Sequence, residues 1–432
     1  MNLGVDQLQS PISFKSPISF KSPISFKSPI SFKSPISFKN HRRVPVSSRS
    51  MVGLFAGIGG LELGLSEQGW STELLCEIDP GAQAVLGARF PDTPVHGDVT
   101  KLRSLPSGTE LVAAGFPCQD LSQAGLTAGI TGSRSGLVDE VFRLVKRRKG
   151  PRWLLIENVP FMLQLSRGAA MRHITDALSD LGYTWAYRVV DARSFGLPQR
   201  RQRVLMLASR TEDPREVLFG QDAGPVPEGD PSEQPCGFYW TEGTRGLGWA
   251  INAVPTLKGG SSIGIASPPA IRLPSGEIVT PGIIGAERLQ GFDPDWTAPA
   301  LSLPGVRAGH RWKLVGNAVS VRMASWVASQ LDQPQPHDDS EDTPLLPGQA
   351  WPTAAWGRNG SSFRVHRSTW PVHEPYEDLS DFLDDSRLLS ARATAGFLKR
   401  AKMGNLRFVP GFLDDVESHL DRMGGHPTPR AA

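Results

Sequence analysis

The chain has 432 residues, of which 21% are charged, and a formal net charge of +3. This length allows two or three domains and a well-buried core, and the nearly neutral balance does not by itself predict a nucleic-acid partner. Its three cysteines, Cys76, Cys118 and Cys236, are too few for a disulfide framework and lack CxxC zinc spacing, which fits a reducing cytoplasm. No apolar run approaches the length of a membrane span, and the N-terminus lacks the apolar core of a signal peptide.

The N-terminal segment repeats SPISFK five times between Ser10 and Lys39. Eight Lys or Arg residues against one Asp give residues 1–50 a net charge of +7. A proline in every repeat forbids helix, and a period of six fits no packed element, so we expect a disordered basic tail. The tail could be a tether that rides on phosphates, or a tolerated tandem duplication that contacts nothing. Translation could also begin at Met51.

From Met51 onward, short apolar runs alternate with amphipathic segments, which predicts a parallel sheet with crossover helices. Met51–Phe55 and Thr72–Glu77 read as strands. Gly60–Gln68 reads as a helix, and Pro80 opens the next one. The clearest helix is Gly136–Lys149, which has one apolar face and a KRRK cluster at its C-terminus.

Four informative residues follow the carboxyl ends of predicted strands: Phe55, Glu77, Cys118 and Glu157. They would line one edge of the sheet, where open α/β sheets place their ligands. The strand that ends at Gly115 would carry Cys118 just beyond its tip, which makes this cysteine a candidate nucleophile. By residue type alone, a lone cysteine is more often a small buried hydrophobe.

The glycine turn FAGIGGLELG is only a partial dinucleotide fingerprint. Gly57 and Gly59 fit the first two positions of GxGxxG, but the third falls on Glu62. Glycines at the start of a helix still let the backbone approach a ligand closely. The turn therefore indicates a ligand site without naming the ligand.

Further motifs follow the glycine turn in a fixed order: Gly97-Asp98, GFPCQ at 115–119, ENV at 157–159, LPQRRQRV at 197–204, ERLQGF at 287–292 and GNAVS at 316–320. Together they resemble the cytosine-5 DNA methyltransferase family over about Val52 to Trp326. The resemblance implies an α/β fold, in which a Rossmann-like S-adenosylmethionine-dependent methyltransferase sheet carries an inserted small target-recognition domain. One minor departure is Asp293, which stands where the family often has the proline that here is Pro294.

The resemblance also assigns a site for S-adenosyl-L-methionine. Phe55 would lie against the adenine, Glu77 would accept the ribose hydroxyls, Asp98 would read the adenine amino group, and Asn317 would lie near the methionine end. The cofactor-binding residues that it implies are Phe55, Gly57, Gly59, Glu77, Ile78, Asp98, Pro117 and Asn317. No metal is expected.

The implied chemistry explains three residue types. Carbon 5 of cytosine is a poor nucleophile until a thiolate adds to carbon 6, and Cys118 would supply that thiolate. A carboxyl group at nitrogen 3 and a cation at the carbonyl oxygen would stabilise the addition, and by resemblance these are Glu157 and Arg203. Carbon 6 is inaccessible in a stacked duplex, so the base must flip out.

Several other residues are expected near the DNA. The segment 119–136, with Gln119, Ser122 and Arg134, resembles the mobile loop that closes over the flipped base. Gln199 would help hold the loop in which it lies, and Arg201 would position that loop or a phosphate. Arginines at the end of a strand are, however, often only exposed to solvent.

Residues 211–281 no longer show alternating strand and helix patterns, and they are rich in Gly, Pro and Ser. In the resembled family this is the target-recognition region, and Thr256-Leu257 matches a pair commonly found there. Arg245, Lys258 and Arg272 could meet bases or phosphates, or could be solvated loop charges. ERLQGF is expected to pack this domain rather than to do chemistry.

We expect five segments: the tail 1–50, a catalytic and cofactor-binding domain 51–209, a target-recognition domain 210–309, a helix returning to the catalytic domain 310–331, and a linker with a C-terminal extension of unknown role 332–432.

The sequence is thus identified as that of a DNA (cytosine-5-)-methyltransferase, acting on double-stranded DNA as the modification half of a bacterial restriction system. Functional pairing with a restriction endonuclease, a monomeric state and a cytoplasmic location are expected. An RNA methyltransferase and a catalytically silent DNA-binding protein on the same fold are the alternatives. A Rossmann oxidoreductase is disfavoured by Glu62 and by the Pro-Cys loop.

Overall fold

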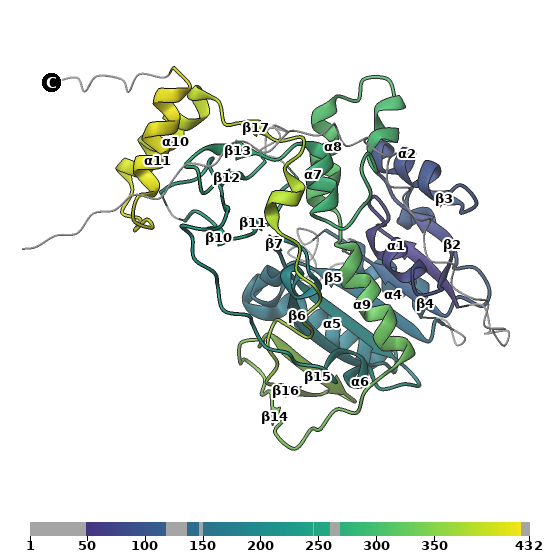
Figure 1. The fold of residues 1–432 in the computed structure, drawn as a ribbon. Coiled ribbons are helices and arrows are strands. Elements are labelled where there is room, and N and C mark those ends of the chain that lie inside the picture. Colours follow the sequence, from purple (N-terminus) through teal and green to yellow (C-terminus); the bar gives the residue numbers. More distant parts are fainter. Residues whose placement is uncertain (1–48, 118–135, 147–149, 245, 260–267, 425–432) are drawn as a thin grey trace, which may run out of the picture. The chain divides into compact units, whose positions relative to one another are not determined.

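A computed structural model of the chain describes residues 49–117, 136–146, 150–244, 246–259 and 268–424. Within these residues, ten strands form one mixed sheet in the order β14-β16-β15-β6-β8-β5-β4-β1-β2-β3 (Figure 1). In chain order, the strands are β1 (Ser50–Leu54), β2 (Ser71–Cys76), β3 (Val95–His96), β4 (Leu111–Ala114), β5 (Trp153–Asn158), β6 (Thr184–Asp191), β8 (Gln202–Ser209), β14 (Thr343–Pro344), β15 (Ala354–Arg358) and β16 (Ser361–Arg364).

The α/β pattern expected from the sequence is confirmed, with one difference in strand direction. β3, β2, β1, β4 and β5 run parallel to one another. β8 instead runs antiparallel between β5 and β6. Only residues 192–201 separate β6 from β8, which is too short for the crossover that a parallel connection requires, so the chain must reverse direction.

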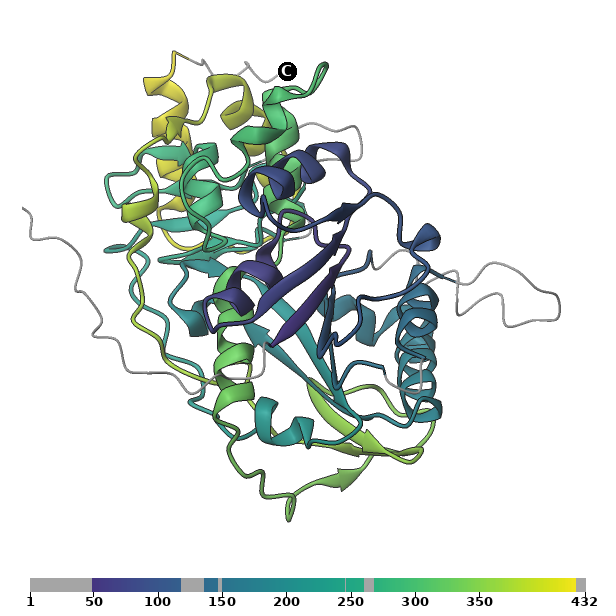
Figure 2. The same ribbon diagram turned by 90° about the vertical axis from the view of Figure 1, so that its right-hand side faces the viewer.

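Helices cover both faces of the sheet because side chains along each central strand alternate in direction (Figure 2). Val112 and Leu154 face one core with α4 and α5, whereas Leu111 and Leu155 face the other with α1, α6 and α9. The α-helices are α1 (Gly60–Ser66), α2 (Pro80–Arg89), α4 (Leu137–Val145), α5 (Ala169–Asp180), α6 (Pro214–Leu218), α7 (Ile283–Arg288), α8 (Ala308–Asn317), α9 (Val321–Asp332), α10 (Ala391–Met403) and α11 (Phe412–Arg422). Short 3-10 turns are η1 (Val99–Lys101), η2 (Pro160–Leu163), η3 (Leu165–Gly168), η4 (Ala192–Phe195), η5 (Ala298–Ser302) and η6 (Leu379–Phe382).

A second, smaller sheet follows β8. Its strands are β9 (Cys236–Phe238), β10 (Ala250–Ile251), β12 (Ala270–Arg272), β13 (Ile278–Thr280) and β17 (Arg387–Leu388). They pair antiparallel in the order β10-β9-β12-β13-β17. A separate parallel pair, β7 (Gln199–Arg200) with β11 (Val254–Pro255), joins the loop before β8 to this smaller sheet.

The C-terminal segment contributes to both sheets. β15 pairs with β6, so the segment expected as a linker and extension supplies an edge of the large sheet. β17 pairs with β13, and α10 and α11 pack on the smaller sheet through Phe238, Phe397 and Phe412. The segment expected as a returning helix is two helices, α8 and α9. No helix in the described ranges is long and apolar enough to cross a membrane.

Candidate active site

The glycine turn after β1 has an open side. Phe55, Gly57 and Gly59 all have positive φ, at 55°, 57° and 87°. A Cβ on Gly57 would meet no atom within 4 Å, whereas one on Gly59 would lie 2.4 Å from the ring of Phe90. Gly57 therefore leaves its backbone open to a ligand, and Gly59 is required for packing.

Glu77 closes this turn from the end of β2. Its Oε2 accepts a hydrogen bond from the Gly57 N–H at 2.7 Å, and its Oε1 accepts from Ile78 and Asp79 at 2.8 Å each. Burial raises the pKa of the Glu77 carboxyl, although these backbone bonds act in the opposite direction. The next side chain, Ile78, is 72% exposed, which offers apolar surface at the mouth of the turn.

Asp98 lies one strand further along the same edge. It begins η1, where its Oδ1 accepts hydrogen bonds from both the backbone and the hydroxyl of Thr100. These bonds lower the pKa of Asp98. An open glycine backbone, an anchored carboxylate, an exposed apolar side chain and an ionised acid together suit the adenosine part of S-adenosylmethionine.

Phe116, which comes two residues before the predicted nucleophile, contacts both the glycine turn and the end of β5. The rings of Phe55 and Phe116 meet edge to face with centroids 6.3 Å apart. Asn158 Nδ2 donates to the Phe116 carbonyl at 3.0 Å and so ties the end of β5 to the residue before Pro117. Cys118, Gln119, Ser122 and Arg134 lie outside the described residues.

Glu157 and Arg203 form a buried ion pair across β5 and β8. Arg203 Nε lies 2.8 Å from Glu157 Oε1, and the two side chains are 8% and 9% exposed. Burial lowers the pKa of Arg203, and the charge of Glu157 partly offsets that effect. Glu157 Oε2 would lie 3.7 Å from a Cβ on Gly115, which puts its carboxylate beside the loop that begins after β4.

Arg201 and Gln199 are internal cross-links. Arg201 is 1% exposed, and its guanidinium donates to the carbonyls of Leu257 and Ala318 at 3.3 and 2.5 Å. Gln199 donates to the carbonyl of Leu289 and accepts from the backbone of Leu257. Of the two roles expected for Arg201, these contacts support positioning of the loop.

The predicted recognition residues lie close to these cross-links. The Thr256 hydroxyl donates to the Arg200 carbonyl at 2.8 Å, and Leu257 is buried. Lys258 Nζ lies 2.5 Å from a Glu242 carboxylate oxygen and 3.7 Å from the centre of the Tyr239 ring. Arg245 lies outside the described residues.

Two other predicted residues have mainly structural contacts. Arg272 pairs with Asp415 of α11 at 2.8 Å and donates to the Pro231 carbonyl, which favours a structural role. Asn317 ends α8, and its Oδ1 would lie 2.5 Å from a Cβ on Gly259. Gly259 therefore packs directly against Asn317 at the end of α8, where a larger residue would collide.

A cavity of about 440 Å³ opens beside the ion pair, lined by Pro160, Arg200, Gln202, Arg203 and Thr256. Sequence reasoning did not single out Arg200, Gln202 or Pro160. The available signal was the alternation in QRRQR, because the buried residues Gln199, Arg201 and Arg203 alternate with the more exposed Arg200 and Gln202.

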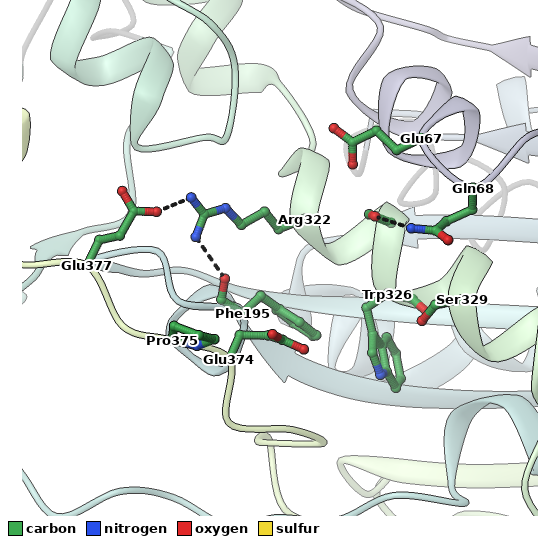
Figure 3. A pocket seen from close by; sticks show the side chains of 10 residues that line it. Glu67, Gln68, Phe195, Arg322, Trp326, Ser329, Glu374, Pro375 and Glu377 are labelled. Atoms are coloured by element: carbon green, nitrogen blue, oxygen red, sulfur yellow. Dashed lines mark hydrogen bonds and ion pairs between the residues drawn. The ribbon is translucent and has the colours of Figure 1, made fainter. Parts of the chain in front are cut away.

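A second cavity of about 500 Å³ shares no residue with the first. Figure 3 shows Arg322 of α9 pointing toward Glu377 and the Phe195 carbonyl, with Trp326 further along the same helix. No cysteine is among the residues that line it, and neither is any residue of the sequence motifs. The smaller cavity is the better candidate for the reaction.

A mixed α/β sheet with an open glycine turn, the anchored Glu77 and a buried Glu157–Arg203 pair is the arrangement expected of a Rossmann-like methyltransferase. Residues 50–234 match the model of the family described as C-5 cytosine-specific DNA methylase. The Type II methyltransferase M2.BsuMI of Bacillus subtilis (strain 168) is 50% identical over 384 residues, covering 86% of this chain and 98% of the relative. The Type II methyltransferase M.BsuFI of Bacillus subtilis is 28% identical over 66% of this chain and 72% of the relative.

The chain belongs to the C-5 cytosine-specific DNA methylase family. It is therefore an enzyme, a DNA cytosine-5 methyltransferase of the restriction-modification type, for which S-adenosylmethionine is the methyl donor. The family and enzyme class predicted from the sequence are confirmed.

Proposed function

We propose that the enzyme methylates carbon 5 of a flipped-out cytosine in a specific double-stranded DNA sequence through a covalent bond between Cys118 and carbon 6. The observation that carries this proposal is the Glu157–Arg203 pair at 2.8 Å, which lies beside the strand leading into Pro117-Cys118. In this proposal the pair supplies an acid and a cation that stabilise the negative charge developing on the pyrimidine ring.

Cys118 is the best candidate thiolate because the other two cysteines are poorly suited. Cys76 and Cys236 are buried, and burial raises the pKa of their thiols to about 12 and about 11. Both thiols therefore stay protonated at neutral pH, whereas a thiol must lose its proton before it can act as a nucleophile. Cys118 instead follows Pro117, whose side chain is exposed.

The proposed addition balances charge within the site. The Cys118 thiolate forms a bond to carbon 6, and the displaced electron pair moves into the ring as nitrogen 3 takes up a proton from solvent, which the Glu157 carboxylate holds there. Arg203 stabilises the negative charge that grows on the carbonyl oxygen. S-adenosylmethionine supplies, when bound, a methyl group on a sulfonium. The electron pair at carbon 5 takes up that methyl group as the sulfur–methyl bond breaks and the sulfur leaves as a neutral thioether. Carbon 5 then loses its proton to solvent base, and the electron pair released expels the Cys118 thiolate.

We assign the cofactor to the edge formed by Phe55, Gly57, Glu77, Ile78 and Asp98. Gly57 provides the open backbone, and Glu77 is held by three backbone N–H groups, so the turn is rigid before the ligand arrives. Exposed Ile78 can cover one face of an adenine, and Asp98 can accept from its amino group.

The flipped cytosine is assigned to the cavity that Arg203, Arg200 and Thr256 line. Its volume of about 440 Å³ is within the usual range for small-molecule sites. The small antiparallel sheet, with residues 210–309, is proposed to choose the DNA sequence, and the segment 119–136 to close over the base. We further propose that the enzyme is a monomer that protects cytoplasmic host DNA from a partner endonuclease.

Bisulfite sequencing of DNA from cells that express the enzyme tests this function. We expect one recurring sequence to be fully protected from conversion, and Cys118→Ala to abolish that protection. The same DNA should resist one class of restriction endonuclease. Unmethylated DNA together with methylated tRNA in these cells would contradict the proposal and favour an RNA substrate.

A further inference from the structure

The C-terminal helical hairpin, α10 with α11, is built into the smaller sheet (Figure 1). Phe397 of α10 and Phe412 of α11 are buried against Phe238 of β9, with ring centroids 5.2 and 5.1 Å from it. His419 Nδ1 accepts from the Ile278 backbone at 3.2 Å, and its Nε2 lies 2.9 Å from the Leu389 carbonyl. The hairpin therefore completes the proposed recognition domain from the far end of the chain.

Charge is segregated between the two helices of the hairpin. Residues 391–411 contain five basic residues and no acid, whereas α11 contains Asp414, Asp415, Glu417 and Asp421. Two of these acids are paired, Asp415 with Arg272 of the smaller sheet and Glu417 with Lys402 of α10. No acid within α10 offsets its basic residues, so this helix carries a positively charged face.

Three cations remain free to meet a partner: Arg392, Lys399 and Arg407, which we call the basic face. All three are exposed, and none has an ion pair or hydrogen bond within the described part of the chain. Arg392 and Lys399 are seven positions apart and so lie on one side of α10, opposite buried Phe397 and Leu398. Arg407 follows in the loop between the helices.

A chain of side-chain contacts connects α10 to the cavity beside Arg203. Arg400 donates to the carbonyls of Trp240 and Glu242 at 2.7 and 3.1 Å. The Glu242 carboxylate pairs with Lys258, two residues beyond Thr256 at the cavity. These contacts connect the hairpin to the segment that reaches the cavity at Thr256.

We propose that the basic face binds the phosphate backbone of the substrate DNA outside the recognition sequence. This inference rests on the proposed function, because the DNA that contacts the basic face would be the same duplex whose flipped cytosine occupies the cavity. Flexible basic side chains that have no neighbouring group to recognise a base are suited to binding phosphates. Phosphate contacts fix the position of a duplex but carry no sequence information. The contacts should strengthen binding to all sequences equally and should be sensitive to salt.

The test compares a triple variant, Arg392→Gln with Lys399→Gln and Arg407→Gln, against the unaltered enzyme in fluorescence anisotropy with a duplex that contains the methylated sequence. Removing three phosphate contacts should lower the slope of log Kd against log salt by roughly 2.7. Between 50 and 200 mM salt the unaltered enzyme should therefore lose roughly 40-fold more affinity than the variant. Turnover at saturating DNA and the methylated sequence should not change.

Two controls separate this inference from the proposed function. Arg103→Gln with Arg167→Gln and Arg358→Gln removes three exposed cations elsewhere and should leave the salt slope unchanged. Arg392→Lys with Lys399→Arg and Arg407→Lys should bind like the unaltered enzyme. An unchanged slope in the first triple variant, with normal methylation by the unaltered enzyme, would overturn the inference alone. Failure of the unaltered enzyme to methylate DNA would instead remove the proposed function.

Discussion

Glu157 Oε1 lies 2.8 Å from Arg203 Nε, and the pair joins two neighbouring antiparallel strands at the edge of the cavity. Each strand supplies one member, so the sheet itself fixes the distance between the acid and the cation. Substituting either residue should reduce the rate of methyl transfer more than it reduces the stability of the fold, because both side chains are proposed to act on the cytosine ring.

Glu157→Gln should therefore lower kcat by about 100-fold or more, since a positioned acid typically contributes that much. Arg203→Lys should lower kcat too, because an ammonium cannot reproduce the guanidinium geometry. Single-turnover methyl transfer and cofactor titration would separate chemistry from binding. Glu140→Gln, a half-buried acid of α4 that pairs with Arg143 and does not line the cavity, is the control. Near-normal kcat for both site variants would remove the pair from the chemistry.

Arg201 and Arg200 are adjacent in sequence and should behave oppositely. Arg201→Met would leave the carbonyls of Leu257 and Ala318 without partners, at a cost of about 3 kcal/mol in the free energy of unfolding. Arg200→Met, at the cavity, should weaken DNA binding and leave stability nearly unchanged. Urea denaturation and anisotropy measure the two effects. A stable Arg201 variant with weak DNA binding would indicate a phosphate contact instead.

The alternation between strands and helices from β1 to β5 was predictable because each element has its own apolar period. Met51–Phe55 and Thr72–Glu77 were placed within a residue of β1 and β2. The role of Arg201 was less accessible, because its burial depends on α8 and on the segment at Leu257, both distant in the chain.

The C-terminal contribution could not be predicted from local pattern. β14 and β17 have two residues each, too few to show a period, and β14 contains a proline. β15 is stabilised by pairing with β6, some 170 residues earlier in the chain, and no local signal encodes that partner. The amphipathic stretches of α10 and α11 were visible, whereas their partner Phe238 was not.

Glu62 gives a prediction for pH dependence. It is fully buried, its carboxyl oxygens have no hydrogen-bond partner among the described residues, and burial raises its pKa from 4.5 to about 8. Between pH 4.5 and 8 the unfolded chain ionises Glu62 while the folded chain keeps the proton, so stability falls as pH rises through this window.

Glu62→Gln should remove that loss. Its stability relative to the unaltered enzyme should grow by about 4 kcal/mol from pH 4.5 to pH 8 and then level off. Urea denaturation across this range measures the difference, and Glu67→Gln on the exposed side of the same segment is the matched control. A stability difference independent of pH would mean that Glu62 ionises normally in the folded enzyme.

The α10–α11 hairpin should matter for stability through its buried rings. Phe397→Ala should cost about 3 to 5 kcal/mol, because Phe397 is fully buried between Phe238 and Phe412. Met403→Ala, at a side chain that is 74% exposed, should cost almost nothing. Thermal unfolding followed by tryptophan fluorescence compares them. Equal melting temperatures would show that the hairpin does not stabilise the smaller sheet.

Trapping on DNA that carries 5-fluorocytosine at the target position tests the central claim most directly, because fluorine blocks the last elimination and leaves the proposed bond to the cysteine intact. With S-adenosylmethionine present, we predict a complex that survives denaturing electrophoresis and a cross-linked peptide that contains Cys118. Cys76→Ala and Cys236→Ala, if folded, should still trap DNA, whereas Cys118→Ala should not. A denaturant-resistant complex formed by Cys118→Ala, or methylation of DNA by that variant, would contradict the account.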